Sequence, residues 1–479
     1  MSYIKEDDFK LSKREIEKQK KKSLELSIKE GSAASVMSGA GSSFISPFAL
    51  ALNASNLQIG FLSSFVGLIG PLAQLQSIHL MEHYSRKKIV VITVLIQALL
   101  WLPIMLLGAM YYFKFWLDYL AILLIIFYSL NIGVGAIASP AWFSWMGDLV
   151  PENKRGKYFS RRNRITGFVA IISMLIAGIA LDFFKTKGLV LTGFTIIFSV
   201  SIISRLYSAG LLNKHYSPKF KLKNGYYFSF NDFIKKGLNT NFGRFTMYVA
   251  LINFAVAIAA PFFTVYMLRD LGLSYIWFTL ISLSSSVFSL LVFPFWGKFA
   301  DKYGNRMVII ISSIFLPLVP ILWIISPSKL YLLFVPSLVG GIFWAGFNLS
   351  AFNFIYDCTN PEHRAICSVY HNMIVGIGIF AGAIFGGLIA KYSSITIMGN
   401  VFFFIFAVSG VLRIVFALIY LPKIKEIKHF PKPPMLIKEI KLMHNIGHNI
   451  NHMNASIMHS PYHSRYFSKR LRKLKGVFD

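Results

Sequence analysis

The sequence predicts an all-α polytopic membrane protein with twelve transmembrane helices in two six-helix repeats. Three observations support this fold class: an apolar composition, a series of long apolar runs, and charged motifs that recur at fixed spacings. Hydrophobic residues make up 55% and aromatic residues 16% of the 479 positions, and the mean hydropathy is +0.58. A soluble domain of this size could not bury so much apolar surface.

Twelve apolar runs follow the N-terminal tail, and each has the roughly 20 residues that a helix needs to span a bilayer. We expect a charged tail at 1–30, a six-helix bundle at 31–213, a polar and aromatic connector at 214–242, a second bundle at 243–421, and a basic, His-rich tail at 422–479. The predicted spans are 31–52, 57–81, 89–111, 119–147, 157–183, 189–213, 243–268, 276–299, 307–325, 330–356, 366–390 and 395–421.

The net charge of +29 comes from basic residues in the tails and in alternate loops. The loop after the fourth span carries a cluster from Lys154 to Arg164, whereas an opposite loop carries only Lys114. This is the positive-inside pattern, so both termini are expected in the cytoplasm and the chain is expected to be a multi-pass protein of the cell membrane. The pattern argues against a nucleic-acid partner. It indicates anionic lipid headgroups as partners of Arg161, Arg162 and Arg164.

Metals, cofactors and disulfides are not predicted. The first thirty residues are rich in Lys and Glu, which rules out an ordinary cleaved signal peptide. Cys358 and Cys367 are the only cysteines, so free thiols are expected. In the C-terminal tail His444, His448 and His452 recur every four residues, a spacing that can hold a divalent metal. A basic amphipathic helix on the membrane surface is the favoured interpretation, because no Cys or carboxylate completes a metal site.

The two predicted bundles resemble copies of one unit. The segment from Glu82 to Lys87 aligns with the segment from Asp301 to Arg306 at an offset of 219 residues. An offset that changes only across loops is what duplication followed by small insertions leaves. Further pairs lie at offsets of 209 or 208: Asp148 and Asp357, Arg155 and Arg364, Asn163 and Asn372, Gly167 and Gly376, and Arg205 and Arg413.

A short charged loop lies between the eighth and ninth predicted spans. Its residues Gly297, Asp301, Gly304 and Arg306 form the pattern G-x-x-x-D-x-x-G-x-R. Gly297 lets a neighbouring helix approach closely, and Asp301 suits the positive end of the next helix dipole. The pattern, its spacing and its membrane context resemble the signature loop of the major facilitator superfamily of transporters. The first-half copy departs from the pattern, with Ser85 aligned to Gly304.

The resemblance implies a transporter without enzymatic activity, whose two halves rock around a central site. It also implies that the loop helps to hold the outward-facing state. Asp148 and Asp357 end the fourth and tenth spans, so we expect Asp148 to receive Arg86 or Lys87 and Asp357 to receive Arg306. The alternative is that these residues are interfacial charges that only set the topology. The predicted conformational latch consists of Gly297, Asp301, Gly304, Arg306, Asp357, Arg364, Asp148 and Arg155.

The resemblance also implies that spans 1, 4, 7 and 10 line a central cavity. Neutral, small and aromatic residues dominate these spans, which favours an uncharged or amphipathic small-molecule substrate held by hydrogen bonds and stacking. Packing inside the bundle is the alternative role for each residue. The predicted cavity residues are Ser43, Asn131, Trp142, Asn253, Tyr266, Trp344 and Asn348.

Acidic residues fall in tails, loops or span ends, so the sequence predicts no embedded carboxylate. Such carboxylates serve as proton relays in carriers, and we therefore expect transport that does not require a proton gradient. No G-x-x-x-x-G-K-S/T loop for ATP is present. A monomeric solute carrier, either secondary-active or facilitative, is the favoured function. A lipid or multidrug exporter of the same fold and a non-transporting receptor or scaffold are the alternatives.

Overall fold

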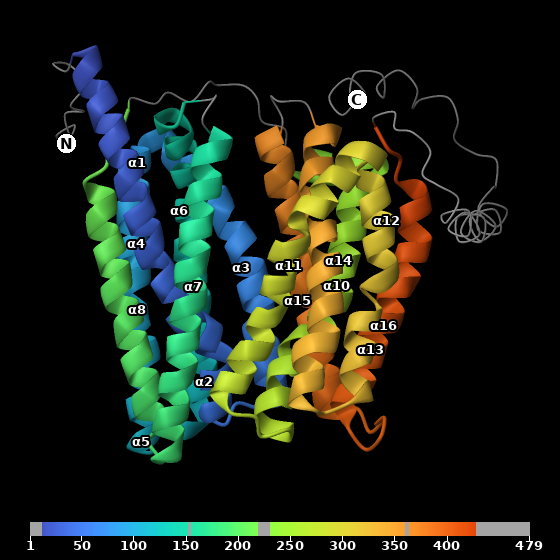
Figure 1. The fold of residues 1–479 in the computed structure, drawn as a ribbon. Helices are drawn as coiled ribbons and strands as arrows, with labels where there is room; N and C mark the ends of the chain where they lie inside the picture. The colour runs from blue at the N-terminus through green and yellow to red at the C-terminus, as the bar shows by residue number, and fades with distance from the viewer. Residues whose placement is uncertain (1–11, 152–154, 219–229, 360–363, 428–479) are drawn as a thin grey trace. The chain divides into compact units, whose positions relative to one another are not determined.

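The computed structural model describes residues 12–151, 155–218, 230–359 and 364–427. Within these ranges the regular structure is helical, apart from a single bridge between Ile397 and Asn400. Residues 219–229 of the polar connector and the His-rich tail beyond residue 427 lie outside the described residues, and so does the expected metal-spaced histidine series. The predicted all-α fold class is confirmed (Figure 1).

Two units are defined by the packing of the backbone. Unit 1 contains residues up to 224 together with 261–280. Besides residues 261–280, unit 1 contains the helices of the first half of the chain. In chain order they are α1 (Lys13–Val36), the π-helix η2 (Met37–Gly41), η3 (Ser42–Phe44), α2 (Ile45–Ala51), α3 (Asn56–His83), α4 (Arg86–Leu99), α5 (Trp101–Tyr112), η4 (Leu117–Tyr119), α6 (Leu120–Leu149), α7 (Arg155–Thr186) and α8 (Val190–Asn213).

Unit 2 contains residues 225–260 and those from 281 onward. The boundary between the units therefore falls inside α10 and inside α11, so residues 261–280 pack with unit 1. The remaining helices are α9 (Phe230–Lys236), η6 (Gly237–Asn239), α10 (Asn241–Val265), the π-helix η7 (Tyr266–Asp270), α11 (Tyr275–Tyr303), α12 (Asn305–Phe315), α13 (Leu318–Ile325), α14 (Lys329–Cys358), α15 (Arg364–Tyr392), α16 (Val401–Tyr420) and η8 (Leu421–Lys423).

Eleven helical segments among the described residues are long and apolar enough to cross a membrane. The remaining predicted span, at 31–52, is helical but broken into the end of α1, η2, η3 and α2. Pro47 contributes to the break because it has no N–H for the carbonyl four residues earlier. Gly39 allows the close approach of α7, since a Cβ there would lie 2.3 Å from the Ala170 carbonyl oxygen. The tail boundary expected at residue 30 falls inside α1.

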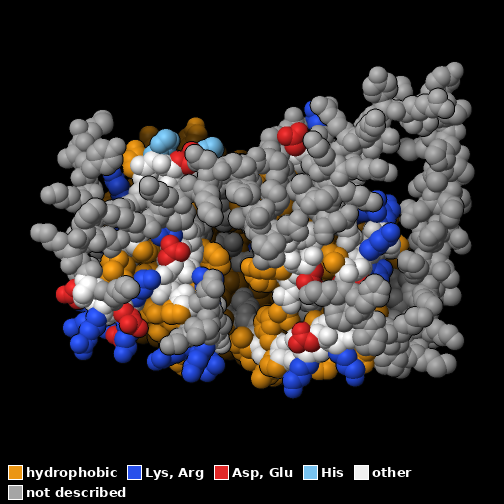
Figure 2. Space-filling view, turned by 90° about the horizontal axis from the view of Figure 1, so that it is seen from above, with side chains coloured by type: hydrophobic (Ala, Val, Ile, Leu, Met, Phe, Trp, Pro, Cys, Tyr) orange, Lys and Arg blue, Asp and Glu red, His pale blue; other side chains and the backbone are white. Residues whose placement is uncertain are grey.

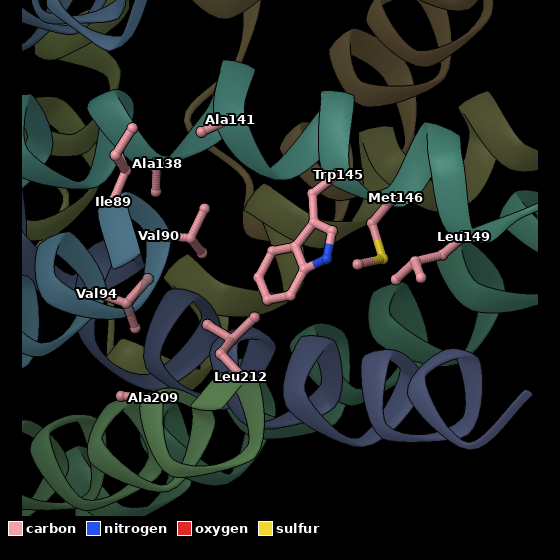
Figure 3. Close-up of a cluster of buried hydrophobic side chains, with 10 residues drawn as sticks. All are labelled: Ile89, Val90, Val94, Ala138, Ala141, Trp145, Met146, Leu149, Ala209 and Leu212. Atoms are coloured by element: carbon pink, nitrogen blue, oxygen red, sulfur yellow. The ribbon is translucent and has the colours of Figure 1, made fainter. Parts of the chain in front are cut away.

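The core of unit 1 is a cluster shared by α4, α6 and α8 (Figure 3). Trp145 and Met146 of α6 pack against Val90 of α4 and Leu212 of α8, and the Trp145 indole N–H donates to the Tyr216 carbonyl at 2.9 Å. Lipid is as apolar as these side chains, so close packing and interhelical hydrogen bonds stabilise the bundle in place of water exclusion. Truncating a packed Trp of this kind to Ala costs about 3–5 kcal/mol.

Large apolar side chains cover the outside of both units. Ile203 of α8 is 67% exposed and Leu291 of α11 is 72% exposed. In water such surfaces would aggregate, whereas in a bilayer they face lipid. Lys and Arg side chains are exposed on the face shown in Figure 2. The exposed basic residues of the chain include Lys18, Lys88 and Arg161.

Candidate functional site

Arg86 and Asp148 form an ion pair in unit 1. Arg86 is the first residue of α4, and its Nη2 lies 2.7 Å from Oδ2 of Asp148 near the end of α6. The Nη1 group of Arg86 also donates to the carbonyl and hydroxyl oxygens of Ser144, both at 3.0 Å. Arg86 is one of the two basic residues expected to contact Asp148. The Arg86 side chain is buried, and these charge-assisted contacts offset the cost of removing its charge from water.

The corresponding contact in unit 2 uses a different residue from the one expected. Asn305, the first residue of α12, donates from Nδ2 to Oδ2 of Asp357 at 2.8 Å. The expected pairing of Arg306 with Asp357 is wrong, because consecutive helical residues point about 100° apart. Arg306 instead donates from Nε to the Ile424 carbonyl at 2.6 Å, and its backbone N–H donates to Glu426 at 2.8 Å. The sequence offset of 219 correctly aligns Asn305 with Arg86.

Of the two glycines in the signature loop, Gly304 adopts a backbone conformation that requires glycine, whereas Gly297 has no close neighbour among the described residues. Gly304 precedes α12 with φ at +90° and ψ at 155°, a conformation that is essentially restricted to glycine. In unit 1 the aligned Ser85 has ordinary extended angles and caps α4 by accepting a hydrogen bond from the Lys88 N–H. The close helix approach expected at Gly297 is absent, since no atom would lie within 4 Å of a Cβ there among the described residues.

The remaining latch residues lie at the same end of their units. Asp301, exposed in the last turn of α11, makes no hydrogen bond or ion pair to another described residue. It lines a hollow of about 530 Å³ together with Asn305, Asn353 and Asp357. Arg155 donates to the Gly147 carbonyl at 2.9 Å. Arg364 begins α15, but its side chain lies outside the described residues.

Two of the predicted cavity residues are buried inside the helical packing. Asn131 is fully buried and donates from Nδ2 to the Gln97 carbonyl at 2.8 Å, so the expectation that it lines a cavity is wrong. Tyr266 is also buried, in the π-helix η7. Hydropathy could not distinguish a polar side chain satisfied by a neighbouring helix from one that faces open space. The partly or fully exposed cavity candidates are Ser43, Trp142, Asn253, Trp344 and Asn348.

Sequence reasoning missed a buried ion pair between α1 and α7. Glu30 is 3% exposed, and its Oε1 lies 2.9 Å from Nη2 of Arg162. Arg162 also donates from Nε to the Ser27 hydroxyl at 3.2 Å, and its guanidinium stacks 4.4 Å from the Trp142 ring. Arg162 was expected to bind lipid headgroups. Glu30, the last residue of the expected tail, is buried near the start of α7 and the end of α8.

The ion pair belongs to a network that crosses unit 1. The Ser208 hydroxyl donates to Oε2 of Glu30 at 3.4 Å, and Nη1 of Arg205 reaches the same hydroxyl at 3.5 Å. Nε of Arg205 donates to Oε1 of Gln97 at 2.9 Å, and the Gln97 amide continues to Asn131 at 3.4 Å. Helices α1, α4, α6, α7 and α8 all contribute. Arg205 is therefore a partly buried member of the network, and its guanidinium donates to an amide oxygen.

The aligned positions of unit 2 lack this charge pair. The offset of 219 aligns Ser27 with Thr246 and Glu30 with Val249, and the offset of 209 aligns Arg162 with His371. Nδ1 of His371 lies 3.0 Å from the Thr246 hydroxyl, just as Arg162 contacts Ser27. The repeat offsets place Arg162 opposite His371, so the sequence already indicated that the two residues occupy the same position of the repeat. Glu30 gave no such signal, because it stands among the charges of the N-terminal tail.

Comparisons with known proteins agree with this architecture. The family model described as Major Facilitator Superfamily matches residues 31–252 and again 245–447. A search among curated proteins gives no match.

Several solved structures are similar in fold. The nucleoside transporter NupG has a TM-score of 0.62 and 17% identity, covering 84% of this chain and 99% of NupG. A bacterial homologue of the iron transporter ferroportin, in an inward-facing state, has a TM-score of 0.58 and 16% identity over 86% of this chain and 99% of its own. The xylose transporter XylE from E. coli has a TM-score of 0.58 and 14% identity over 87% and 100%. At these identities the likeness shows the fold alone.

Proposed function

Because the chain belongs to the major facilitator superfamily, a family of membrane transporters, we propose that it is a secondary carrier that moves a small neutral or amphipathic solute by alternating access. The superfamily makes the chain an integral multi-pass membrane protein and not an enzyme. The proposed location is the cell membrane with both termini in the cytoplasm, as the distribution of basic residues favours. We also propose that the Asp148 and Asp357 contacts act as the conformational latch.

The observation that carries the proposal is the Glu30–Arg162 pair. Burying two charges is costly even when they are paired, and unit 2 builds the aligned junction with Val249 and His371. The fold can therefore pack this junction without the two charges, and a buried ionisable pair in a membrane protein is by default a candidate functional site.

The geometry of the pair suits an uncharged polar solute. Arg162 keeps 14% of its side chain exposed, and its Nη1 group makes no hydrogen bond to a described residue. Glu30 balances its charge, so a neutral solute could accept a hydrogen bond from Nη1 without leaving a net charge buried. The half-buried indole of Trp142 beside it supplies an apolar contact surface for an amphipathic solute.

Uptake into proteoliposomes tests the proposal. The full chain would be reconstituted and assayed with labelled uridine, xylose and ferrous ion, and with a wider set of neutral metabolites. Arg162→Gln should lower the initial rate for the transported solute about 10- to 100-fold, because a lost charge-assisted hydrogen bond is worth about 1.5–3 kcal/mol. Arg161→Gln, an exposed neighbour on α7, is the matched control. Equal rates for the two variants would contradict the role of Arg162, and ligand binding without uptake would favour a receptor.

A groove on unit 1 supports a lipid or multidrug exporter as the second candidate. The groove has a volume of about 560 Å³, and exposed Lys29 lies among its lining residues. An amphipathic lipid could place its chain along the groove and its headgroup at Lys29. Accelerated flipping of a fluorescent phospholipid in the reconstituted vesicles, reduced by Lys29→Gln, would favour this function. The apolar lining residues are Ile28, Ala33, Val36, Val169, Val200 and Ile203.

A further inference from the structure

Residues 261–280 join the end of α10 to the start of α11 and pack with unit 1, although both helices continue into unit 2. The segment is compact. The Leu271 N–H donates to the Tyr266 carbonyl and the Leu273 N–H to the Met267 carbonyl, both at 2.9 Å, and Gly272 between them has φ at +58°. The segment therefore holds its shape through its own hydrogen bonds, and its attachment to unit 1 depends on a separate set of contacts.

Asp182 of α7 makes the central attachment. Its Oδ1 accepts the Tyr275 N–H at 2.6 Å, and its Oδ2 accepts the Ile276 N–H at 2.9 Å. These N–H groups belong to the first turn of α11, where they have no partner within the helix. Asp182 lies in the last turns of α7, where the helix dipole disfavours a carboxylate. The positive N-terminus of α11 favours a carboxylate and offsets that cost, so the contact with α11 stabilises Asp182 at this position.

The helices meet at backbone distance around this clamp. Gly178 lies one turn before Asp182, and a Cβ there would stand 2.5 Å from the Thr279 hydroxyl and 3.3 Å from the Tyr275 carbonyl. The Tyr275 ring packs edge-on against Phe194 with centroids 5.8 Å apart, and Lys185 lies 5.5 Å above it. Glycine is therefore needed for α7 to reach the start of α11.

Both ends of the segment show backbone features typical of a hinge. On α10 the boundary falls immediately before Pro261, whose missing N–H leaves a gap in the helical hydrogen bonds. On α11 the boundary falls at Ile281, whose carbonyl accepts a 2.7 Å hydrogen bond from the Ser284 hydroxyl. A side-chain hydroxyl that bonds the backbone in this way competes with the hydrogen bonds of the helix. The two weak points in the helices coincide with the edges of the segment that unit 1 holds.

We propose that residues 261–280 form a gate segment, hinged at Pro261 and Ile281, and that Asp182 holds it against unit 1 as a positioning residue. Release of the clamp frees the first turn of α11 and opens the path to this end of the membrane. The proposal rests on the alternating-access function, because a carrier of that kind must open each end in turn.

Cysteine labelling tests the gate without any solute. Ala54, which is 6% exposed, lines a hollow of about 330 Å³ with Leu268, Arg269 and Tyr275 of the segment. The reporter is Ala54→Cys in the full chain with Cys358→Ala and Cys367→Ala, reconstituted in nanodiscs and reacted with a polar maleimide. Asp182→Asn should raise the labelling rate on the order of tenfold, since a hydrogen-bonded charge is replaced by an amide that cannot accept both N–H groups.

Two controls and a second variant make the result decisive. Gly178→Ala should raise the labelling rate in the same direction by steric displacement, even if Asp182→Asn folds poorly. Asp118→Asn, an exposed acid in η4, and Gly167→Ala, which meets no described atom on α7, should stay within about twofold of the parent.

Equal labelling of the Gly178 and Gly167 variants, or of the Asp182 and Asp118 variants, would overturn the gate. Faster labelling in a protein that moves no solute would instead support the gate and reject the carrier function.

Discussion

In unit 1 the first residue of α4, Arg86, bonds the carboxylate of Asp148, whereas in unit 2 the aligned first residue of α12, Asn305, bonds that of Asp357. The signature pattern is complete only in unit 2, yet the ion pair is in unit 1. The contact is therefore specified by the position of the residue at the start of the helix. Its strength depends on whether that position carries a charge.

The same relation holds deeper in the two units. Arg205 donates to the side chain of Gln97 at 2.9 Å, and the aligned Arg413 donates to the backbone carbonyl of Leu316 at 3.0 Å. Leu316 lies 219 residues after Gln97, so both arginines contact the same position of the repeat. Only unit 1 adds Glu30. The repeat has preserved the geometry of these contacts while the charges diverged, and unit 2 serves as a neutral reference for unit 1.

The largest effect is expected from removing one charge of the buried pair. Glu30→Val leaves Arg162 buried without its counter-ion and should lower the free energy of unfolding by about 3–5 kcal/mol. Adding Arg162→His copies the residues of unit 2 and should recover most of that loss, because both charges are then absent. The initial rate of uptake should lie about 10- to 100-fold below that of the parent in both variants. Thermal unfolding in detergent and proteoliposome uptake measure the two effects, and transport by the double variant would show that the pair is structural.

Removing the helix-start contacts should distinguish the two units. Arg86→Ala should cost about 3 kcal/mol of unfolding free energy, the upper range for hydrogen bonds to charged groups. Asn305→Ala should cost about 1 kcal/mol, because it loses a neutral donor to Asp357. Chemical denaturation of the purified variants provides the comparison. A larger loss for Asn305→Ala would mean that position, rather than charge, sets the strength of the contact.

Exchanging the residues that precede α4 and α12 should give an asymmetric result. Gly304→Ser should cost about 2 kcal/mol, since a side chain is strained at φ of +90°. Ser85→Gly should cost only about 0.3 kcal/mol, because glycine is itself an acceptable N-cap. Thermal unfolding measures both, and equal costs would contradict the conformation of Gly304.

The smallest effect concerns two carboxylates outside the spans. Burial raises the pKa of Glu426 above its ordinary value of 4.5. The folded state then holds a proton that the unfolded state has lost, so stability should fall as pH rises from about 4.5 through the raised pKa. The Ser12 backbone N–H lowers the pKa of Glu15, so this residue should add stability that is present above its ordinary pKa and lost as pH falls through the lowered one. Stability measured against pH should lose the first trend in Glu426→Gln and the second in Glu15→Gln.

The sequence by itself determined the fold class, the spans and the repeat. Whether a segment can cross a bilayer depends on its own length and hydropathy, so eleven of the predicted spans correspond to helices that qualify. The repeat offsets follow from residue identities alone, and they correctly align Arg86 with Asn305. The break in the first span was also visible in part, in Pro47.

Tertiary structure decided which side chains meet. A one-residue difference on α12 turns Arg306 away from Asp357 and brings Asn305 to it, and hydropathy carries no information on that rotation. Glu30 looks like one more charge of a hydrophilic tail until α7 and α8 bury it against Arg162 and Ser208. Asp182 likewise finds its partners at Tyr275 and Ile276, 93 and 94 residues away. Burial and pairing depend on helices distant in the chain, and local composition does not encode their packing.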